Sequence, residues 1–178
     1  MTARSFAAGG PDNEPGGTVS SYLTVIYGAS EANNRLAWQL ARTMPGKSAV
    51  LSVEGLLSGA IAQSSDDAAA ELDMAHTQLR LLVANYMRNG YNVVVEGVFF
   101  HHRDGQLHRY EQDIDQLVAL MRNMTRRAVT VYLRDPEGED GFEYRTRYGV
   151  NALSFDFDGS VETIAEAVLE RLTAGEFT

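Results

Sequence analysis

Along the chain, short apolar runs of the kind found in β-strands alternate with segments whose apolar residues recur at helical spacing. Each change of pattern marks the end of an expected element. Short β-type apolar runs predict five strands, at residues 23–27, 49–53, 91–95, 128–133 and 150–157. Apolar residues at helical spacing predict helices in the segments between and after these runs, at residues 36–41, 72–86, 106–124 and 161–172. Strands that alternate with helices favour an α/β fold, a three-layer sandwich around a mostly parallel five-stranded sheet.

Turn and capping residues agree with these limits. Pro45-Gly46 follows the first helical pattern and Asn89-Gly90 follows the second long one, as expected where a helix stops. Ser64 with Asp67 three positions later has the form of a capping box, and Ser160 is placed to cap the last helix. The run at 91–95 is apolar almost throughout, which is typical of a parallel strand that is covered on both faces.

Length and composition indicate one domain. The chain has 178 residues, of which residues 1–20 are rich in Gly, Pro and Asn, so we expect a flexible tail there and a domain over residues 21–178. It has no cysteine, which excludes disulfides, thiolate zinc sites and cysteine nucleophiles. The formal net charge of −9 opposes bulk binding to nucleic-acid phosphates.

No apolar run approaches the roughly 20 residues that a membrane-spanning helix needs. The first residues also lack the basic and then apolar order of a signal peptide. We therefore expect a cytoplasmic protein without a membrane partner.

The candidate chemistry lies where the first strand meets the first helix. A phosphate-binding loop has the pattern G-x-x-x-x-G-K-[ST], in which backbone N–H groups, a lysine and a hydroxyl hold the phosphates and magnesium of a nucleotide. Gly28 matches the first position of this pattern. Asn33 replaces the second glycine, Asn34 replaces the lysine, and Arg35 replaces the Ser or Thr. Ser30, inside the segment, still offers a hydroxyl.

Further landmarks follow in a fixed order: Ser52-Val53-Glu54, then GYNVVVEGVF at 90–99, VYLRDPEGEDGFEYRTR at 131–147, and FDFDGSVETIAEAVLERL at 155–172. Together with the segment at Gly28, they make residues 22–174 similar to the small P-loop kinases, the group that includes shikimate, gluconate, adenylate and polynucleotide kinases, zeta toxins and chloramphenicol phosphotransferase. The resemblance implies a sheet with the strand order 2-3-1-4-5. It also implies ATP or GTP with Mg2+ as the cofactor of an active member.

The resemblance assigns roles by position. Glu54 falls where many of these kinases keep the acid that receives the acceptor's proton, and Glu96 falls at the acid that orients magnesium. Arg145 and Arg147 fall in the lid whose arginines clamp phosphates. The plainer interpretations are a solvated carboxylate for Glu54, a capping carboxylate for Glu96 and solvated loop arginines for the other two.

Two other kinds of site find little support. His101, His102 and His108 lack the spacing of a helical metal-binding pair, so the sequence does not predict a zinc site. A hydrolase triad is also not indicated, since no G-x-S-x-G motif occurs.

Three hypotheses for function remain. The first is a kinase-like protein with a degenerate phosphate loop, which binds a nucleotide, a phosphorylated small molecule or a protein partner without efficient phosphoryl transfer. The second is an active ATP- or GTP-dependent phosphotransferase on a hydroxyl of a nucleoside, a nucleic-acid end or a small molecule, with Arg35, Arg145 and Arg147 replacing the missing lysine. The third is a structural subunit that uses residues 1–20 in a homo-oligomer or larger assembly.

Overall fold

The centre of the molecule is a five-stranded sheet in which all neighbouring strands are parallel. The computed structural model describes residues 21–28, 30–60, 68–97, 99–103, 106–109, 115–117, 119, 127–134, 152–157 and 160–174. The strands are β1 (Tyr22–Gly28), β2 (Ser48–Ser52), β3 (Asn92–Glu96), β6 (Arg127–Arg134) and β7 (Ala152–Asp156). Their spatial order is β2-β3-β1-β6-β7, which confirms the predicted order 2-3-1-4-5.

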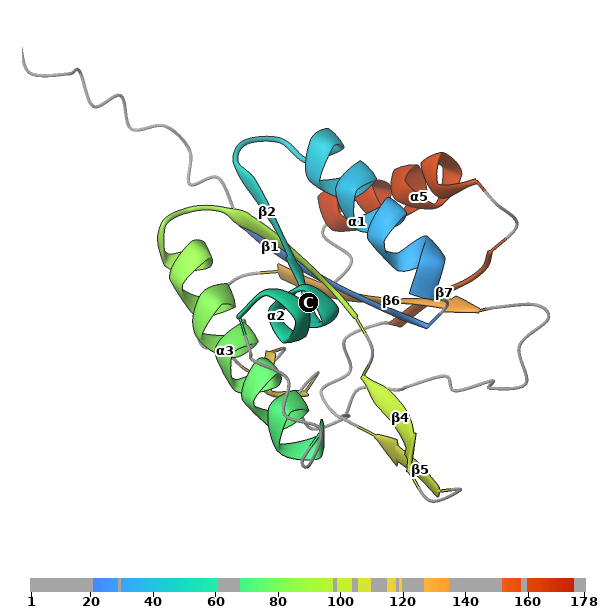
Figure 1. The fold of residues 1–178 in the computed structure, drawn as a ribbon. Coiled ribbons are helices and arrows are strands. Elements are labelled where there is room, and N and C mark those ends of the chain that lie inside the picture. The colour runs from blue at the N-terminus through green and yellow to red at the C-terminus, as the bar shows by residue number, and fades with distance from the viewer. Residues whose placement is uncertain are drawn as a thin grey trace, which may run out of the picture.

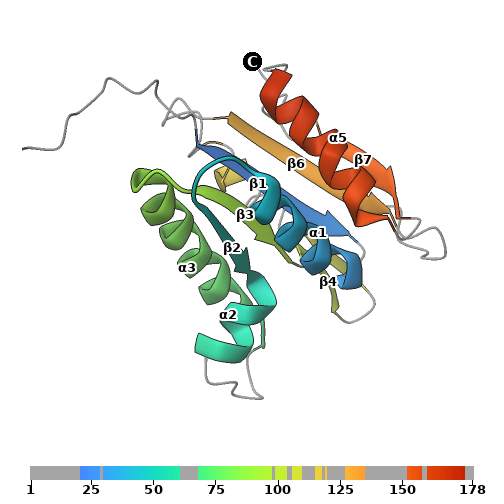
Figure 2. The same ribbon diagram turned by 90° about the horizontal axis from the view of Figure 1, so that it is seen from above.

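Helices cover both faces of this sheet and complete the three predicted layers (Figures 1 and 2). On one face lie α1 (Ser30–Thr43) and α5 (Val161–Ala174), which pack against each other. On the other face lie α2 (Val53–Ala60) and α3 (Ala68–Arg88). The α/β sandwich is the arrangement that the alternation of strand and helix patterns predicts.

Apolar packing on both faces explains why β3 lies inside the sheet, between β2 and the central strand β1. Every residue of β3 is buried, with Val93 and Val95 in the cluster on the α3 side and Val94 in the cluster on the α1 side. The prediction that the near-continuous apolar run at 91–95 is a strand covered on both faces is therefore confirmed.

The buried side-chain amide of Asn92 joins three segments at the end of the sheet where the strands begin. Asn92, which is 1% exposed, accepts a hydrogen bond from the backbone N–H of Tyr22 at 3.1 Å. Its amide group donates to the backbone carbonyl of Pro45 at 2.8 Å. The starts of β1 and β3 and the turn after α1 are thus fixed by a single side chain that the sequence patterns do not mark.

The capping prediction for Ser160 is confirmed. Its hydroxyl oxygen accepts a hydrogen bond from the backbone N–H of Thr163 at 3.4 Å, in the first turn of α5. Gly46 and Gly90, which follow α1 and α3, have φ values of 88° and 79°, as expected for glycines that end helices. The capping box at Ser64 and Asp67 lies outside the described residues.

The helix predicted over residues 106–124 is wrong at its start. Residues 106–109 form strand β5 (Gln106–Arg109), which pairs in antiparallel fashion with β4 (Phe100–Arg103). Residues 115–117 and 119 are helical. The physical signal for the hairpin is Asp104-Gly105, a dipeptide that suits a two-residue turn between antiparallel strands. Figure 1 shows this hairpin extending away from the main sheet.

The second predicted strand is displaced by one residue, since β2 covers residues 48–52 and the prediction covers residues 49–53. β2 ends at Ser52, and Val53 is the first residue of α2, a helix that the sequence patterns missed. The Ser52 hydroxyl oxygen accepts a hydrogen bond from the backbone N–H of Gly55 at 3.1 Å, which is the arrangement of an N-cap. Glu54 therefore sits in the first turn of a helix instead of in a loop after the strand.

Candidate functional site

The candidate site lies at the carboxyl edge of β1, β2 and β3. The strand register places Glu96, the last residue of β3, between Ile26 of β1 and Ser52 of β2. This is the edge at which parallel α/β sheets bind their ligands. The helices that follow β1 and β2 both begin here, so the first turns of α1 and α2 lie at the same end of the sheet (Figure 2).

Gly28 is required by the packing of two strands. Its φ is 112°, a conformation that L side chains rarely adopt. A Cβ atom at this position would lie 2.1 Å from the backbone carbonyl oxygen of Leu133, its partner in β6. The close approach of β1 to β6 is thus sufficient reason for glycine at this position.

The segment expected to form a phosphate loop is mostly helical. α1 begins at Ser30, so only residue 29 separates it from the end of β1. The first-helix prediction is confirmed, but the helix begins six residues before the predicted range 36–41, so Asn33, Asn34 and Arg35 lie in the helix and not in a phosphate loop. In the pattern of a phosphate loop the second glycine permits backbone conformations that are costly for other residues, whereas Asn33 and its neighbours can all take helical dihedral angles.

Asn34 contacts the acid at the end of β3. Its side-chain amide nitrogen donates a hydrogen bond to Oε1 of Glu96 at 3.2 Å. Glu96 is 4% exposed, and within the described part of the chain this is the hydrogen bond that its carboxylate accepts. Asn34, at the position of the kinase lysine, thus forms a hydrogen bond through a neutral amide with Glu96, at the position of the acid that orients magnesium.

Asn33 points inward. The residue is 1% exposed, and among the described residues its Oδ1 atom has no hydrogen-bond partner. Ala32, Leu36 and Leu40 are the buried residues near it on α1, so the helix inserts Asn33 on its sheet-facing side. A buried amide oxygen without a donor is destabilising by roughly 1–3 kcal/mol.

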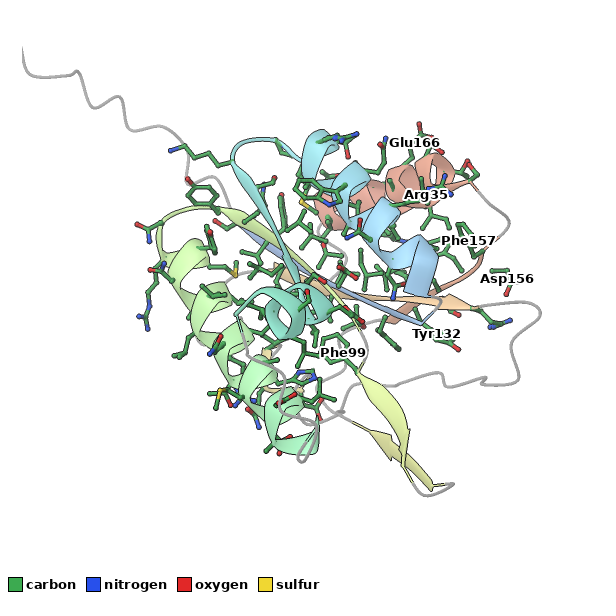
Figure 3. The ribbon with its side chains drawn as sticks, viewed as in Figure 1. Arg35, Phe99, Tyr132, Asp156, Phe157 and Glu166 are labelled. Carbon is green, nitrogen blue, oxygen red and sulfur yellow. The ribbon has the colours of Figure 1, made fainter. Side chains whose placement is uncertain are left out.

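Arg35 lies on the exposed side of α1 (Figure 3). Among the described residues it forms no ion pair or hydrogen bond. Figure 3 places it on the side of the sheet that carries Glu166, opposite the side that carries Phe99 and Tyr132. Asn33, Asn34 and Arg35 follow one another on a helix, so their side chains point in three different directions and do not converge on one ligand.

Glu54 lies near the end of β3 and is exposed. Its Oε2 atom is 3.3 Å from the Ser52 hydroxyl, which donates a hydrogen bond to it. The same atom would lie 3.2 Å from a Cβ built on Gly97, and that Cβ would also meet Val53 at 2.7 Å. Glu54 and the segment Glu96-Gly97 are therefore close together at this edge, and Gly97 allows the close approach.

Other candidate residues are described less completely. Ser30 is the first residue of α1, and its side chain lies outside the described part of the structure. Arg145 and Arg147 lie outside the described residues, as do residues 1–20.

The strand register also pairs two histidines. His101 in β4 stands opposite His108 in β5, a pairing that the expectation of a helix there could not reveal. Within the described part of the chain there is no group of three or more His, Cys, Asp or Glu residues able to hold a metal ion.

Comparisons with known proteins bear on the fold. The APS kinase of Mycobacterium tuberculosis, solved as a mutant, has a TM-score of 0.60 and 16% identity over 86% of this chain and 98% of that one. The hexameric APS kinase from Thiobacillus denitrificans has a TM-score of 0.57 and 16% identity over 87% of this chain and 29% of that one. A de novo designed P-loop fold protein has a TM-score of 0.53 and 11% identity over 88% of this chain and 96% of that one.

These likenesses show a P-loop kinase fold. No family model and no curated protein matches the chain. At these identities the likenesses bear on the fold alone, so function must be argued from the residues at the site. In the described residues no helix is both long enough and apolar enough to cross a bilayer.

Proposed function

We propose that this chain is a P-loop kinase-like protein that acts by binding a ligand or a protein partner, without efficient phosphoryl transfer. The observation that carries the proposal is the hydrogen bond from the Asn34 amide to Glu96 at 3.2 Å, made from the first turns of a helix that starts at Ser30. This contact occupies the edge of the sheet where an active kinase would hold the phosphates of its nucleotide.

Charge supports the proposal. A kinase lysine both holds the nucleotide and offsets the charge that develops during transfer. The Asn34 amide is neutral, so it supplies a hydrogen bond and no charge. The nearest cation along the chain is Arg35, whose side chain is exposed.

Backbone geometry supports it as well. A phosphate loop curves its N–H groups around an anion, whereas the free N–H groups of a helix all point along the axis from its first turn. α1 begins at Ser30, so the segment between Gly28 and Asn34 has almost no residues left to curve. We expect the helix N-terminus to attract anions weakly and without selectivity for a triphosphate.

A magnesium–nucleotide complex suits the residues at this site poorly. Magnesium in such sites needs an oxygen ligand from a hydroxyl and an acid that is free to orient its water molecules. The hydroxyl position is taken by Arg35, and one oxygen of Glu96 accepts the Asn34 amide.

The test is a calorimetric titration of the full chain with ATP and GTP, with and without magnesium. The informative variant is Asn33→Gly with Asn34→Lys and Arg35→Ser, which restores the pattern of a phosphate loop. A matched control is Asn85→Lys with Arg88→Ser, which adds one lysine and removes one arginine at exposed positions of α3 and so leaves the net charge unchanged, as the restored variant does. The proposal predicts no saturable binding for the natural chain or the control, and a gain for the restored variant. Micromolar, magnesium-dependent binding by the natural chain would overturn it.

A transfer assay separates weak activity from none. Labelled ATP is incubated with the chain and with a panel of nucleosides, nucleic-acid ends and small alcohols. The proposal predicts no transfer above the background of buffer alone. Transfer that disappears in Glu54→Ala would instead support an active phosphotransferase with Glu54 as its base.

A further inference from the structure

The outer face of α3 carries large apolar side chains that nothing in the described structure covers. Met74 is 53% exposed and Leu81 is 68% exposed. They are seven residues apart, which is two turns, so they lie on one face of the helix. Figures 1 and 2 both show α3 along one edge of the molecule, with its outer side facing away from the sheet.

These two side chains belong to a longer stripe. Positions on the outer face recur at alternating intervals of four and three residues, the spacing of a helix that packs along another helix: Ala70, Met74, Thr77, Leu81, Ala84 and Arg88. The opposite face of α3, with Ala75, Leu79, Val83 and Met87, is 0% exposed and packs in the core. The helix therefore has one stripe that the fold buries and a second stripe that remains on the surface.

We propose that a second copy of this chain covers the outer stripe, with the two α3 helices packed antiparallel about a two-fold axis near Thr77. In this arrangement Met74 of one copy lies beside Leu81 of the other, and the reverse contact repeats across the axis. The neighbouring positions of the stripe, Ala70, Thr77 and Ala84, are small, so the two helices can approach closely while Met74 and Leu81 fill the space between the helices.

The charges beside the stripe fit this occupant and this orientation. Asp73 and Arg80 flank it on the same side, seven residues apart. An antiparallel pair centred on Thr77 places Asp73 opposite Arg80 of the second copy, and this contact also occurs twice. A parallel pair does not bring these two residues together. In its own chain Arg80 donates to the Thr77 hydroxyl at 3.0 Å, which holds the guanidinium beside the proposed axis.

The length of α3 limits the strength of the contact. A helix of 21 residues is about 30 Å long. One pair of helices buries less surface than the roughly 1,600 Å² of a standard interface, so the dimer is concentration-dependent and not permanent. Arg88 at the end of the stripe is charged, which confines the apolar contact to the first four turns or so.

Sedimentation velocity of the full chain tests the proposal over roughly 1 to 200 µM, the range in which small interfaces dissociate. We expect a shift from the 19.5 kDa monomer to a dimer as concentration rises. Met74→Glu with Leu81→Glu should weaken association at least about tenfold, because it places four carboxylates in the apolar contact. Trp38→Glu, which changes a 50% exposed residue on α1 at the other face of the sheet, should leave association unchanged.

A charge exchange tests the orientation and does not depend on the stability of one variant. Asp73→Arg alone and Arg80→Asp alone each place like charges together across the axis, so each variant should stay monomeric. A mixture of the two variants should form the dimer again, since opposite charges then meet at both contacts. Circular dichroism spectra identify any variant that does not fold. A natural chain that stays monomeric at 200 µM, or a dimer that Trp38→Glu abolishes and the α3 changes do not, would overturn the proposal.

Discussion

Gly28→Ala is expected to be strongly destabilising for reasons that involve no ligand. The new Cβ would lie 2.1 Å from the carbonyl oxygen of Leu133, where ordinary contact begins at 3.4 Å, so β1 and β6 would have to separate locally. The φ of 112° adds backbone strain of about 1–2 kcal/mol for a residue with a side chain. Overpacking adds about 1–3 kcal/mol. The sum is about 2–5 kcal/mol, a large part of the roughly 5–15 kcal/mol that keeps a domain folded.

Gly46→Ala is the matched control. Its φ is 88°, but a Cβ there meets nothing within 4 Å, so it carries the strain without the collision. Urea denaturation followed by circular dichroism gives the free energy of unfolding of both variants and of the natural chain. Gly28→Ala should lose about 1–3 kcal/mol more than Gly46→Ala, the size of the overpacking contribution. Equal losses would refute the reasoning, and the glycine would then need another explanation, such as a bound anion.

Three further predictions follow from single contacts. Asn92→Ala removes two buried hydrogen bonds, to Tyr22 and Pro45. It should lower the free energy of unfolding in urea by about 2–4 kcal/mol, whereas the exposed Asn89→Ala should lower it by less than about 1 kcal/mol. Similar losses for the two variants would contradict this role of Asn92. Arg35→Ala should change that free energy by less than about 0.5 kcal/mol, because the side chain is exposed, and a loss above about 1.5 kcal/mol would point to a buried or paired guanidinium. A double-mutant cycle between Asn34→Ala and Glu96→Ala should give a coupling of about 1–2 kcal/mol, and additive effects would mean that the 3.2 Å hydrogen bond is not formed in solution.

The sequence predicts most of the sheet because its strands differ chemically from their surroundings. β3 could be placed within one residue because all its positions are buried and its three central residues are valines. The order of the strands came from the resemblance to P-loop kinases and not from the strand pattern itself. Local periodicity failed where a turn decides the structure, as at β4 and β5, since Leu107 fits a helical stripe and a strand equally well.

The candidate site was harder to predict for a different reason. The pattern at Gly28 locates the edge of the sheet at which Asn34 and Glu96 meet, but the sequence did not predict the hydrogen bond between them. It does not show whether residues 30–34 curve as a loop or continue as a helix, because that choice depends on the backbone conformations left open when the second glycine is absent. The start of α2 was missed because Ser52 caps it directly at the end of a strand.

The measurement that most directly tests the account is the NMR spectrum of the backbone amides of residues 28–35 during titration with magnesium ATP. The account predicts helical carbon shifts from Ser30 onward in the free protein. It also predicts that these amide signals stay in place as the nucleotide reaches about 1 mM, a concentration well above that needed to saturate a micromolar site. Saturable shifts of the amides from Gly28 to Arg35, with loss of the helical signature at Ser30, would show a working phosphate loop and contradict the account.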